Sequence, residues 1–142
     1  MNRKEFVIPA EEKRLIIEKL ARLISGQDQV VFSFVFGSFS DDDDNNPFQD
    51  IDIGVYVKNM NPKTAVHFSL DLSQAVSKSL HFPVDIRVIN DAPIPFLFHV
   101  IQGKLIVNKD DDVTSGFMEH VMRRYLDMKP LLHHAEKEAF AS

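Results

Sequence analysis

The amino-acid sequence predicts a mixed α/β (α+β) fold in which a small β-sheet is flanked by helices. Three observations support this class: helical and strand-like segments alternate, every strand-like segment is short, and the composition is that of a globular protein. The predicted order is α, β, β, α, β, α, β, α. At 142 residues we expect one domain over 1–142, because such a chain buries roughly 68% of its unfolded surface, enough for one core.

The first predicted helix begins at Pro9 and ends before Gly26. Its apolar residues recur at helical spacing, and proline and acidic side chains occupy its first turn. The recurring residues are Leu15, Ile16, Leu20, Leu23 and Ile24. The next run, QVVFSFVF at 29–36, is rich in Val and Phe and short enough for a buried strand, although periodicity alone does not exclude a helical segment.

A polar loop and a second strand follow this run. The loop over 40–47 consists mainly of Asp and Asn with a proline, which all favour turns. We expect its run of four aspartates, Asp41–Asp44, to be solvated. The stretch DIDIGVYV at 50–57 alternates polar or small residues with Ile and Val, which predicts a strand with one apolar face.

The second half of the chain contains three further helices and two strands. A helix of about five turns follows Pro62, with its apolar residues at Ala65, Val66, Leu70, Leu72, Ala75, Val76 and Leu80. The remaining predictions are a strand at 83–89, a short helix near 94–101, the strand KLIVN after Gly103 and a long helical segment from about 114 to 139. Pro130 can bend or break this last helix.

Composition excludes several classes of function. The absence of cysteine excludes a disulfide scaffold, a thiolate zinc site and a cysteine nucleophile. The N-terminus has no apolar signal core and no run approaches the roughly 18 apolar residues of a membrane span, so we expect a cytoplasmic protein without membrane contact. The net charge of −5 argues against binding to a nucleic-acid backbone.

Two alternating aspartates form the first candidate site. Residues two apart in a strand project to the same face, so Asp50 and Asp52 place two carboxylates side by side. Taken alone, this alternation also fits the solvent face of a half-exposed strand. Adjacent carboxylates raise each other's pKa unless a cation lies between them, and such oxygen ligands suit Mg²⁺. If the strand of Asp85 is a neighbour, three aspartates can hold two divalent ions, as in two-metal phosphoryl-transfer sites.

Gly37 and Ser38 complete the candidate site at the end of the preceding strand. A glycine lets the backbone approach a ligand closely, and a short helix after it would direct N–H groups and a serine hydroxyl at phosphate oxygens. Ser38 also fits a plain helix cap, and the two roles are compatible. Arg87, on the face of Asp85, fits either a phosphate contact or an ion pair with a neighbouring aspartate.

These motifs resemble a known family. Gly37-Ser38, eleven residues at 39–49, the triplet Asp50-Ile51-Asp52 and Asp85 in VDIRVIN resemble the signature of the minimal nucleotidyltransferases (MNT) of the DNA polymerase beta superfamily. The stretches 84–112 and 120–140 are similar to the corresponding parts of MNT proteins that are paired with HEPN toxins. The resemblance therefore covers most of the chain and implies the polymerase beta-like nucleotidyltransferase fold.

The resemblance also implies roles for the five residues. Gly37 and Ser38 would bind the triphosphate, and Asp50 and Asp52 would ligate two Mg²⁺ ions. Asp85 would complete the ligands of the catalytic ion and favour deprotonation of the acceptor. The implied reaction moves AMP from ATP onto a protein acceptor and releases pyrophosphate. Family members are antitoxins that adenylylate a tyrosine of a HEPN ribonuclease, so the implied partners are a HEPN toxin and a nucleoside triphosphate, with a homo-oligomer as a further possibility.

Two departures from the family pattern leave an alternative open. The family usually has ten residues between Gly-Ser and the first aspartate, whereas this chain has eleven. Those residues commonly begin Phe-Ala-Arg-Gly in the family, whereas here Phe39 is followed by Ser40 and Asp41. Four aspartates near a triphosphate would repel it by about 1 kcal/mol per close charge pair in a water-like dielectric. The alternative is a catalytically weak or silent antitoxin that inhibits its partner by binding alone. A nucleotide-sensing module is a third interpretation.

Overall fold

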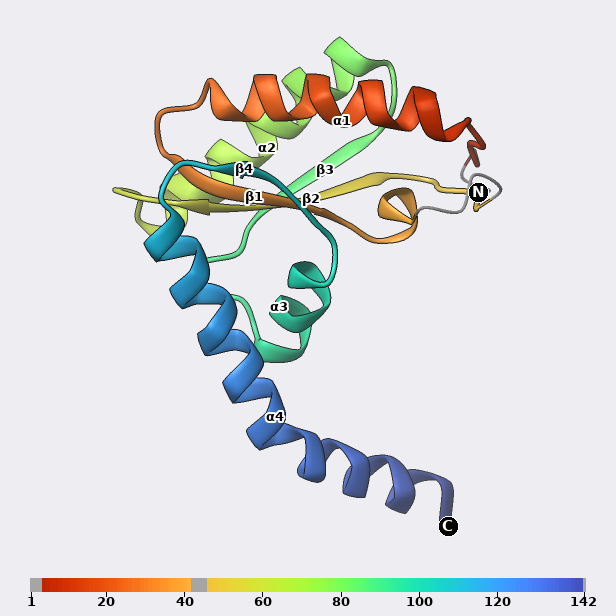
Figure 1. Cartoon of the computed structure of the whole chain (residues 1–142), viewed down its shortest axis with the longest axis vertical. Coiled ribbons are helices and arrows are strands. Elements are labelled where there is room, and N and C mark those ends of the chain that lie inside the picture. The colour runs from red at the N-terminus through yellow and green to blue at the C-terminus, as the bar shows by residue number, and fades with distance from the viewer. Residues whose placement is uncertain (1–3, 42–45, 142) are drawn as a thin grey trace.

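Four strands form one mixed sheet whose order in space is β3-β2-β1-β4 (Figure 1). The strands are β1 (Val30–Phe36), β2 (Ile51–Val57), β3 (Val84–Val88) and β4 (Lys104–Asn108). β1 runs antiparallel to both β2 and β4, whereas β2 and β3 are parallel. This computed structural model, which describes residues 4–41 and 46–141, confirms the predicted mixed sheet and the order of the elements.

Helices cover both faces of the sheet. They are α1 (Ala10–Ser25), the short 3-10 helix η1 (Ser38–Ser40), α2 (Pro62–Leu80), α3 (Ile94–Ile101) and α4 (Asp111–Ala141). α1 and α2 lie on one face, and α3 with the first part of α4 lies on the other (Figure 1). Each face has its own apolar cluster, so the sheet is the middle layer of three.

The two central strands are buried more completely than an alternating pattern predicts. Every residue of β1 is buried, which explains why its sequence shows no alternation and is a strand rather than a helical segment. In β2, Ile51 and Ile53 face the α1 and α2 side, as expected. The opposite face is also covered: Tyr56 stacks on Phe32 with ring centroids 4.9 Å apart. The prediction of one apolar face on this strand is therefore too narrow.

The predicted apolar stripes locate the helices but are wider than the buried surfaces. α1 buries Ile16, Leu20 and Ile24, whereas Leu15 is exposed. On α2, Val66 and Leu70 are exposed although the helical spacing includes them. Only the centre of each stripe contacts the sheet, because a helix on a sheet buries one narrow face.

Two serines of α2 occupy the outer edge of the sheet. β3 is an edge strand, and its outward backbone groups bond to α2. The hydroxyl of Ser73 accepts from the N–H of Ile86 at 2.9 Å and donates to the carbonyl of the same residue at 3.4 Å. Ser77 makes the equivalent pair with Val84 at 2.9 and 3.3 Å. These bonds satisfy the outward groups of Val84 and Ile86, which would otherwise be open to another strand.

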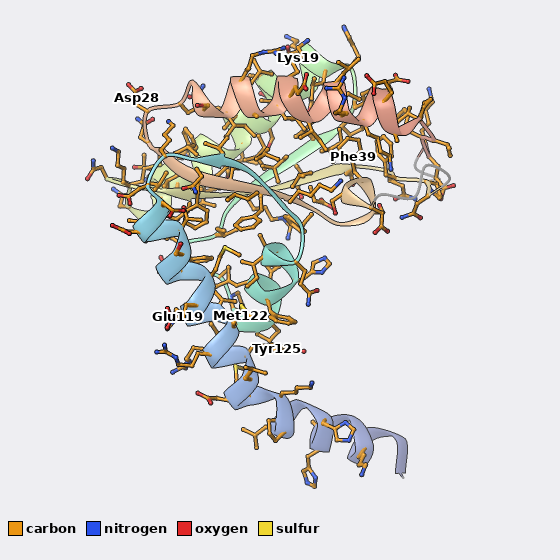
Figure 2. All side chains as sticks on the ribbon, viewed as in Figure 1. Lys19, Asp28, Phe39, Glu119, Met122 and Tyr125 are labelled. Carbon is orange, nitrogen blue, oxygen red and sulfur yellow. The ribbon has the colours of Figure 1, made fainter. Side chains whose placement is uncertain are left out.

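The last helix begins at Asp111, three residues before the predicted start, and continues through Pro130. Asp111 and Asp112 lie in its first turn, where acidic side chains are favourable. Beyond Tyr125 the ribbon changes direction (Figure 2), as expected where a proline removes one backbone hydrogen bond. Within residues 4–41 and 46–141, no helix combines the length and apolar character needed to cross a bilayer.

Candidate active site

One end of the sheet brings together the residues that the sequence singled out. β1 is antiparallel to β2, and β2 is parallel to β3. The end of β1 therefore meets the beginnings of the other two strands. In the strand register, Asp52 lies opposite Phe36 on one side and opposite Asp85 on the other. The strand of Asp85 is thus the neighbour of the strand of Asp52, which was the condition for a shared carboxylate cluster.

Asp52 is the electrostatic centre of this cluster. Its side chain is half-buried on the α3 face of the sheet, and this burial raises the pKa of Asp52 above its ordinary value. The carboxylates of Asp85 and Asp50 raise that pKa further, whereas Arg87 and His99 lower it in part. Asp52 therefore lies close enough to both Asp50 and Asp85 to be repelled by them, and a cation beside Asp52 would relieve the repulsion.

Asp85 forms an ion pair with Arg87. The Nε of Arg87 donates to Oδ2 of Asp85 at 3.1 Å, and the side chain of Arg87 is exposed whereas that of Asp85 is partly buried. The guanidinium also lies 5.7 Å from the ring centroid of Phe96 on α3. Of the two interpretations of Arg87, the pair with its neighbouring aspartate is the one observed. An exposed pair of this kind contributes about 0–1 kcal/mol, so a bound cation can replace it at little cost.

Gly37 brings the backbone against Asp52. Its φ of 79° and ψ of −165° fall in a region that only glycine adopts readily. A Cβ atom built there would lie 2.7 Å from Oδ2 of Asp52. A side chain at residue 37 would therefore occupy the space beside the carboxylate.

Ser38 follows Gly37 as the first residue of η1, and its side chain is exposed. The turn is closed by Ser40, whose N–H and hydroxyl donate to the carbonyl of Gly37 at 3.1 and 2.7 Å. No side-chain hydrogen bond caps η1 within the described part of the chain. The capping role considered for Ser38 is therefore not observed here.

His99 and Phe96 border the site, and the sequence pattern did not single them out. Both belong to α3, which the sequence predicted only as a short apolar helix. The ring centroids of both side chains lie near that of Phe36, at 5.5 Å for His99 and 5.6 Å for Phe96, in edge-to-face contacts. A single histidine within an otherwise apolar helix is the signal that could have indicated proximity to a charged site.

The donor groups suit a divalent cation in kind, since carboxylate oxygens are the ligands that Mg²⁺ prefers. The close approach of the Gly37 backbone to Asp52 and the repulsion that Asp85 and Asp50 exert on Asp52 point the same way. As they stand, however, no three His, Cys, Asp or Glu side chains of the described residues are arranged to hold a metal ion. Binding of Mg²⁺ would thus require the side chains of Asp50, Asp52 and Asp85 to adjust.

Addition of Mg²⁺ is expected to raise the thermal midpoint of unfolding by several degrees. A ligand that binds only the folded state at a hundredfold excess over its Kd stabilises it by about 2.7 kcal/mol. Differential scanning fluorimetry of the wild type and of Asp52→Asn would measure this. The exposed Asp71 on α2 provides a matched control, and Asp71→Asn should keep the full shift. An undiminished shift in Asp52→Asn would place the ion elsewhere.

The acidic run after η1 is described only at its first residue. Asp41 is exposed, and its Oδ2 accepts from Nδ2 of Asn46 at 2.7 Å. Asp42 to Asp44 lie outside the described residues. The expectation that Asp41–Asp44 form a solvated loop therefore stays a prediction.

Comparisons with known proteins bear on the family and the fold of the chain. The sequence model of the family described as "Polymerase beta, Nucleotidyltransferase" matches residues 18–112. No curated protein sequence matches the chain.

Three solved structures illustrate the structural similarity. A chain of the tri-AMPylated Shewanella oneidensis HEPN toxin in complex with its MNT antitoxin superposes with a TM-score of 0.63 at 19% identity, covering 91% of this chain and 95% of that one. A chain of the MntA–HepT toxin–antitoxin superposes with a TM-score of 0.62 at 18% identity, covering 90% of this chain and 95% of that one. A chain of a toxin–antitoxin with AMP-PNP superposes with a TM-score of 0.65 at 20% identity, covering 88% of this chain and 94% of that one. At these identities the similarity supports the fold.

Proposed function

The chain belongs to the polymerase beta nucleotidyltransferase family, and from this premise we propose that it transfers AMP from ATP to a protein acceptor as the antitoxin of a HEPN toxin. One observation carries the proposal above all. Asp52 and Asp85 are partners in the strand register, and the glycine turn lies against Asp52. The similar structures, which include an AMPylated HEPN toxin and a complex with AMP-PNP, support the choice of nucleotide and partner.

Each residue has a distinct part in the proposed reaction. Gly37 and Ser38 offer backbone N–H groups and an exposed hydroxyl to the triphosphate. Asp50, Asp52 and Asp85 would hold two Mg²⁺ ions, which would neutralise the phosphates and lower the pKa of the acceptor hydroxyl. The acceptor oxygen would form a bond to the α-phosphorus while the bond from that phosphorus to the pyrophosphate oxygen breaks, and the carboxylate of Asp85 would take up the proton that the acceptor hydroxyl loses.

The acceptor is proposed to approach the site from the side of Asp85. β3 is an edge strand, where the side chain of Arg87 is exposed and that of Asp85 is 43% exposed. Asp52, by contrast, is half-buried between the two neighbouring strands. A protein acceptor can therefore reach Asp85 from solvent while the nucleotide lies against Asp52 and Gly37.

A catalytically weak or silent antitoxin is the second candidate function. The acidic run Asp41–Asp44 favours it, because these charges follow directly after the turn proposed to bind the triphosphate. Inhibition of the toxin would then depend on contact alone.

Incubation with α-labelled ATP, Mg²⁺ and a purified HEPN protein encoded beside this chain would separate the two candidates. For an active transferase we expect label on the HEPN protein, and a loss of about a thousandfold in labelling rate in the double variant Asp50→Asn Asp52→Asn. Asp71→Asn serves as the matched control and should label at the wild-type rate. Inhibition of the toxin that survives the double change without label would favour the silent antitoxin. Tight ATP binding without release of pyrophosphate would instead favour a nucleotide sensor.

A further inference from the structure

A cavity of about 380 Å³ lies on the face of the sheet opposite the carboxylates. Residues of α1 between Ala10 and Glu18 form one wall, and Phe39, Asp41 and Lys104 form the other. Figure 2 shows Phe39 beneath α1, on the side of η1 that faces this helix. The volume falls within the range of roughly 300–1,000 Å³ that is typical of small-molecule sites.

Lys13, in the wall of this cavity, is 5% exposed and is the buried charged side chain among those whose exposure the structure describes. Its ammonium group lies 5.6 and 5.9 Å from the ring centroids of Phe39 and Phe48. Its Nζ donates to the carbonyl oxygen of Asp41 at 3.4 Å, which is long for a hydrogen bond. Burial of an ammonium group is costly unless its charge is compensated, and among the described residues two aromatic faces and one long bond are its contacts.

The other wall residues define what the cavity can hold. Arg14 is bound by Glu11 and Glu18, each at 2.6 Å, so its charge is compensated at the rim. Ala10, Ile17 and Phe39 present mainly apolar surface. Of the two carboxylates in the wall, Glu18 pairs with Arg14 and Asp41 accepts from Nδ2 of Asn46, so the cavity combines apolar walls with a cationic group at Lys13. A molecule that matches both has a flat apolar body and an anionic group.

We propose that this cavity is a second ligand site, for a small organic anion whose apolar body lies between α1 and Phe39 and whose charge pairs with Lys13. Nucleoside monophosphates have this chemistry. The site is separate from the proposed transfer reaction, because α1 covers the face opposite Asp52. Phe39 is the middle residue of η1, so an occupant would contact the same short helix that begins at Ser38.

Titration of the full-length, ¹⁵N-labelled protein with AMP in the presence of EDTA tests this site. EDTA removes divalent ions, so nucleotide binding that needs metal at the carboxylates is suppressed. We expect saturable shifts of the α1 backbone amides around Lys13 and Ile17. Adenosine and inorganic phosphate, which each carry half of the required chemistry, should bind at least about tenfold more weakly than AMP.

Variants separate this proposal from a general effect on the fold. Lys13→Met keeps the length of the side chain but removes its charge and should weaken AMP binding by about tenfold or more. Lys63→Met, at an exposed position on α2, is the matched control and should bind as the wild type does. Ala10→Leu narrows the cavity from its exposed rim without changing any charge and should also weaken binding.

The proposal is overturned if AMP leaves the α1 amides unchanged, or if both Lys13→Met and Ala10→Leu bind AMP with wild-type affinity while folded. Asp52→Asn keeps this test independent of the proposed transferase activity. That variant should retain AMP binding at α1 even where it transfers no nucleotide. The proposed ligand site and the proposed transferase activity can therefore be refuted independently of each other.

Discussion

Replacement of Asp52 by asparagine should lower the rate of nucleotide transfer by about a thousandfold, which corresponds to about 4 kcal/mol of transition-state stabilisation. The amide keeps the shape of the side chain but removes the charge that lies between Asp50 and Asp85. Without that charge, cation binding is weaker and the triphosphate is aligned less well. Pyrophosphate release and transfer of label to the acceptor, measured at saturating ATP, would quantify the loss.

The same substitution should not weaken the fold at neutral pH. Burial, Asp85 and Asp50 all raise the pKa of Asp52 in the folded state above the ordinary value of 3.8. Between that value and the raised pKa the folded state binds more protons than the unfolded state, so wild-type stability falls as the pH increases through this window. Asparagine does not titrate, so Asp52→Asn does not lose stability in this way as the pH rises. Its stability should be flatter across the window and at least equal to that of the wild type at pH 7.

Urea unfolding at several pH values would measure this difference. A loss of stability in Asp52→Asn at pH 7 would assign Asp52 a structural role and count against the transferase. Asp71→Asn should change neither activity nor the pH profile, because Asp71 lies exposed on α2.

Substitution of Gly37 by alanine should cost both stability and activity. The backbone at this residue has a φ of 79° and a ψ of −165°, and an alanine held there is strained by about 1–3 kcal/mol. The new methyl group would also lie 2.7 Å from Oδ2 of Asp52, so the carboxylate must move. Displacement of a reacting group by about 1 Å can lower a rate by about a hundredfold, and we expect a loss of that size.

Unfolding in urea and transfer assays on the same preparation would test this prediction. Gly116→Ala is the matched control, because Gly116 lies within α4 and a Cβ there meets nothing within 4 Å. That control should gain up to about 1 kcal/mol of stability through helix propensity and keep full activity. Wild-type activity and stability in Gly37→Ala would show that the turn has no need of glycine.

Much of the fold could be predicted because local patterns determine where elements begin and end. The short helix over 94–101 and the strand after Gly103 were located by apolar spacing and a glycine, and the structure places them at the same residues. The spacing of Asp50 and Asp52 also predicted a shared face. Strand neighbours are not encoded locally, however, so the pairing of Asp52 with Asp85 could be stated only as a condition.

Contacts between distant segments account for what the sequence left undetermined. Lys13 lies on the stripe that includes Ile16 and Leu20, and its charge alone suggests an exposed position. It is buried because Phe39 and Phe48, far along the chain, present their ring faces to it. The approach of His99 to Asp52 likewise depends on how α3 packs, which no spacing within α3 specifies.

The serine pairs on the β3 edge limit how a partner can engage this molecule. Ser73 and Ser77 already satisfy the outward N–H and carbonyl groups of Ile86 and Val84. A binding protein therefore finds the main-chain groups of Val84 and Ile86, on either side of Asp85, already taken, which disfavours extension of the sheet at this point. Recognition there must depend on side chains, which favours an acceptor hydroxyl presented by a protruding loop or helix terminus over one within an extended strand.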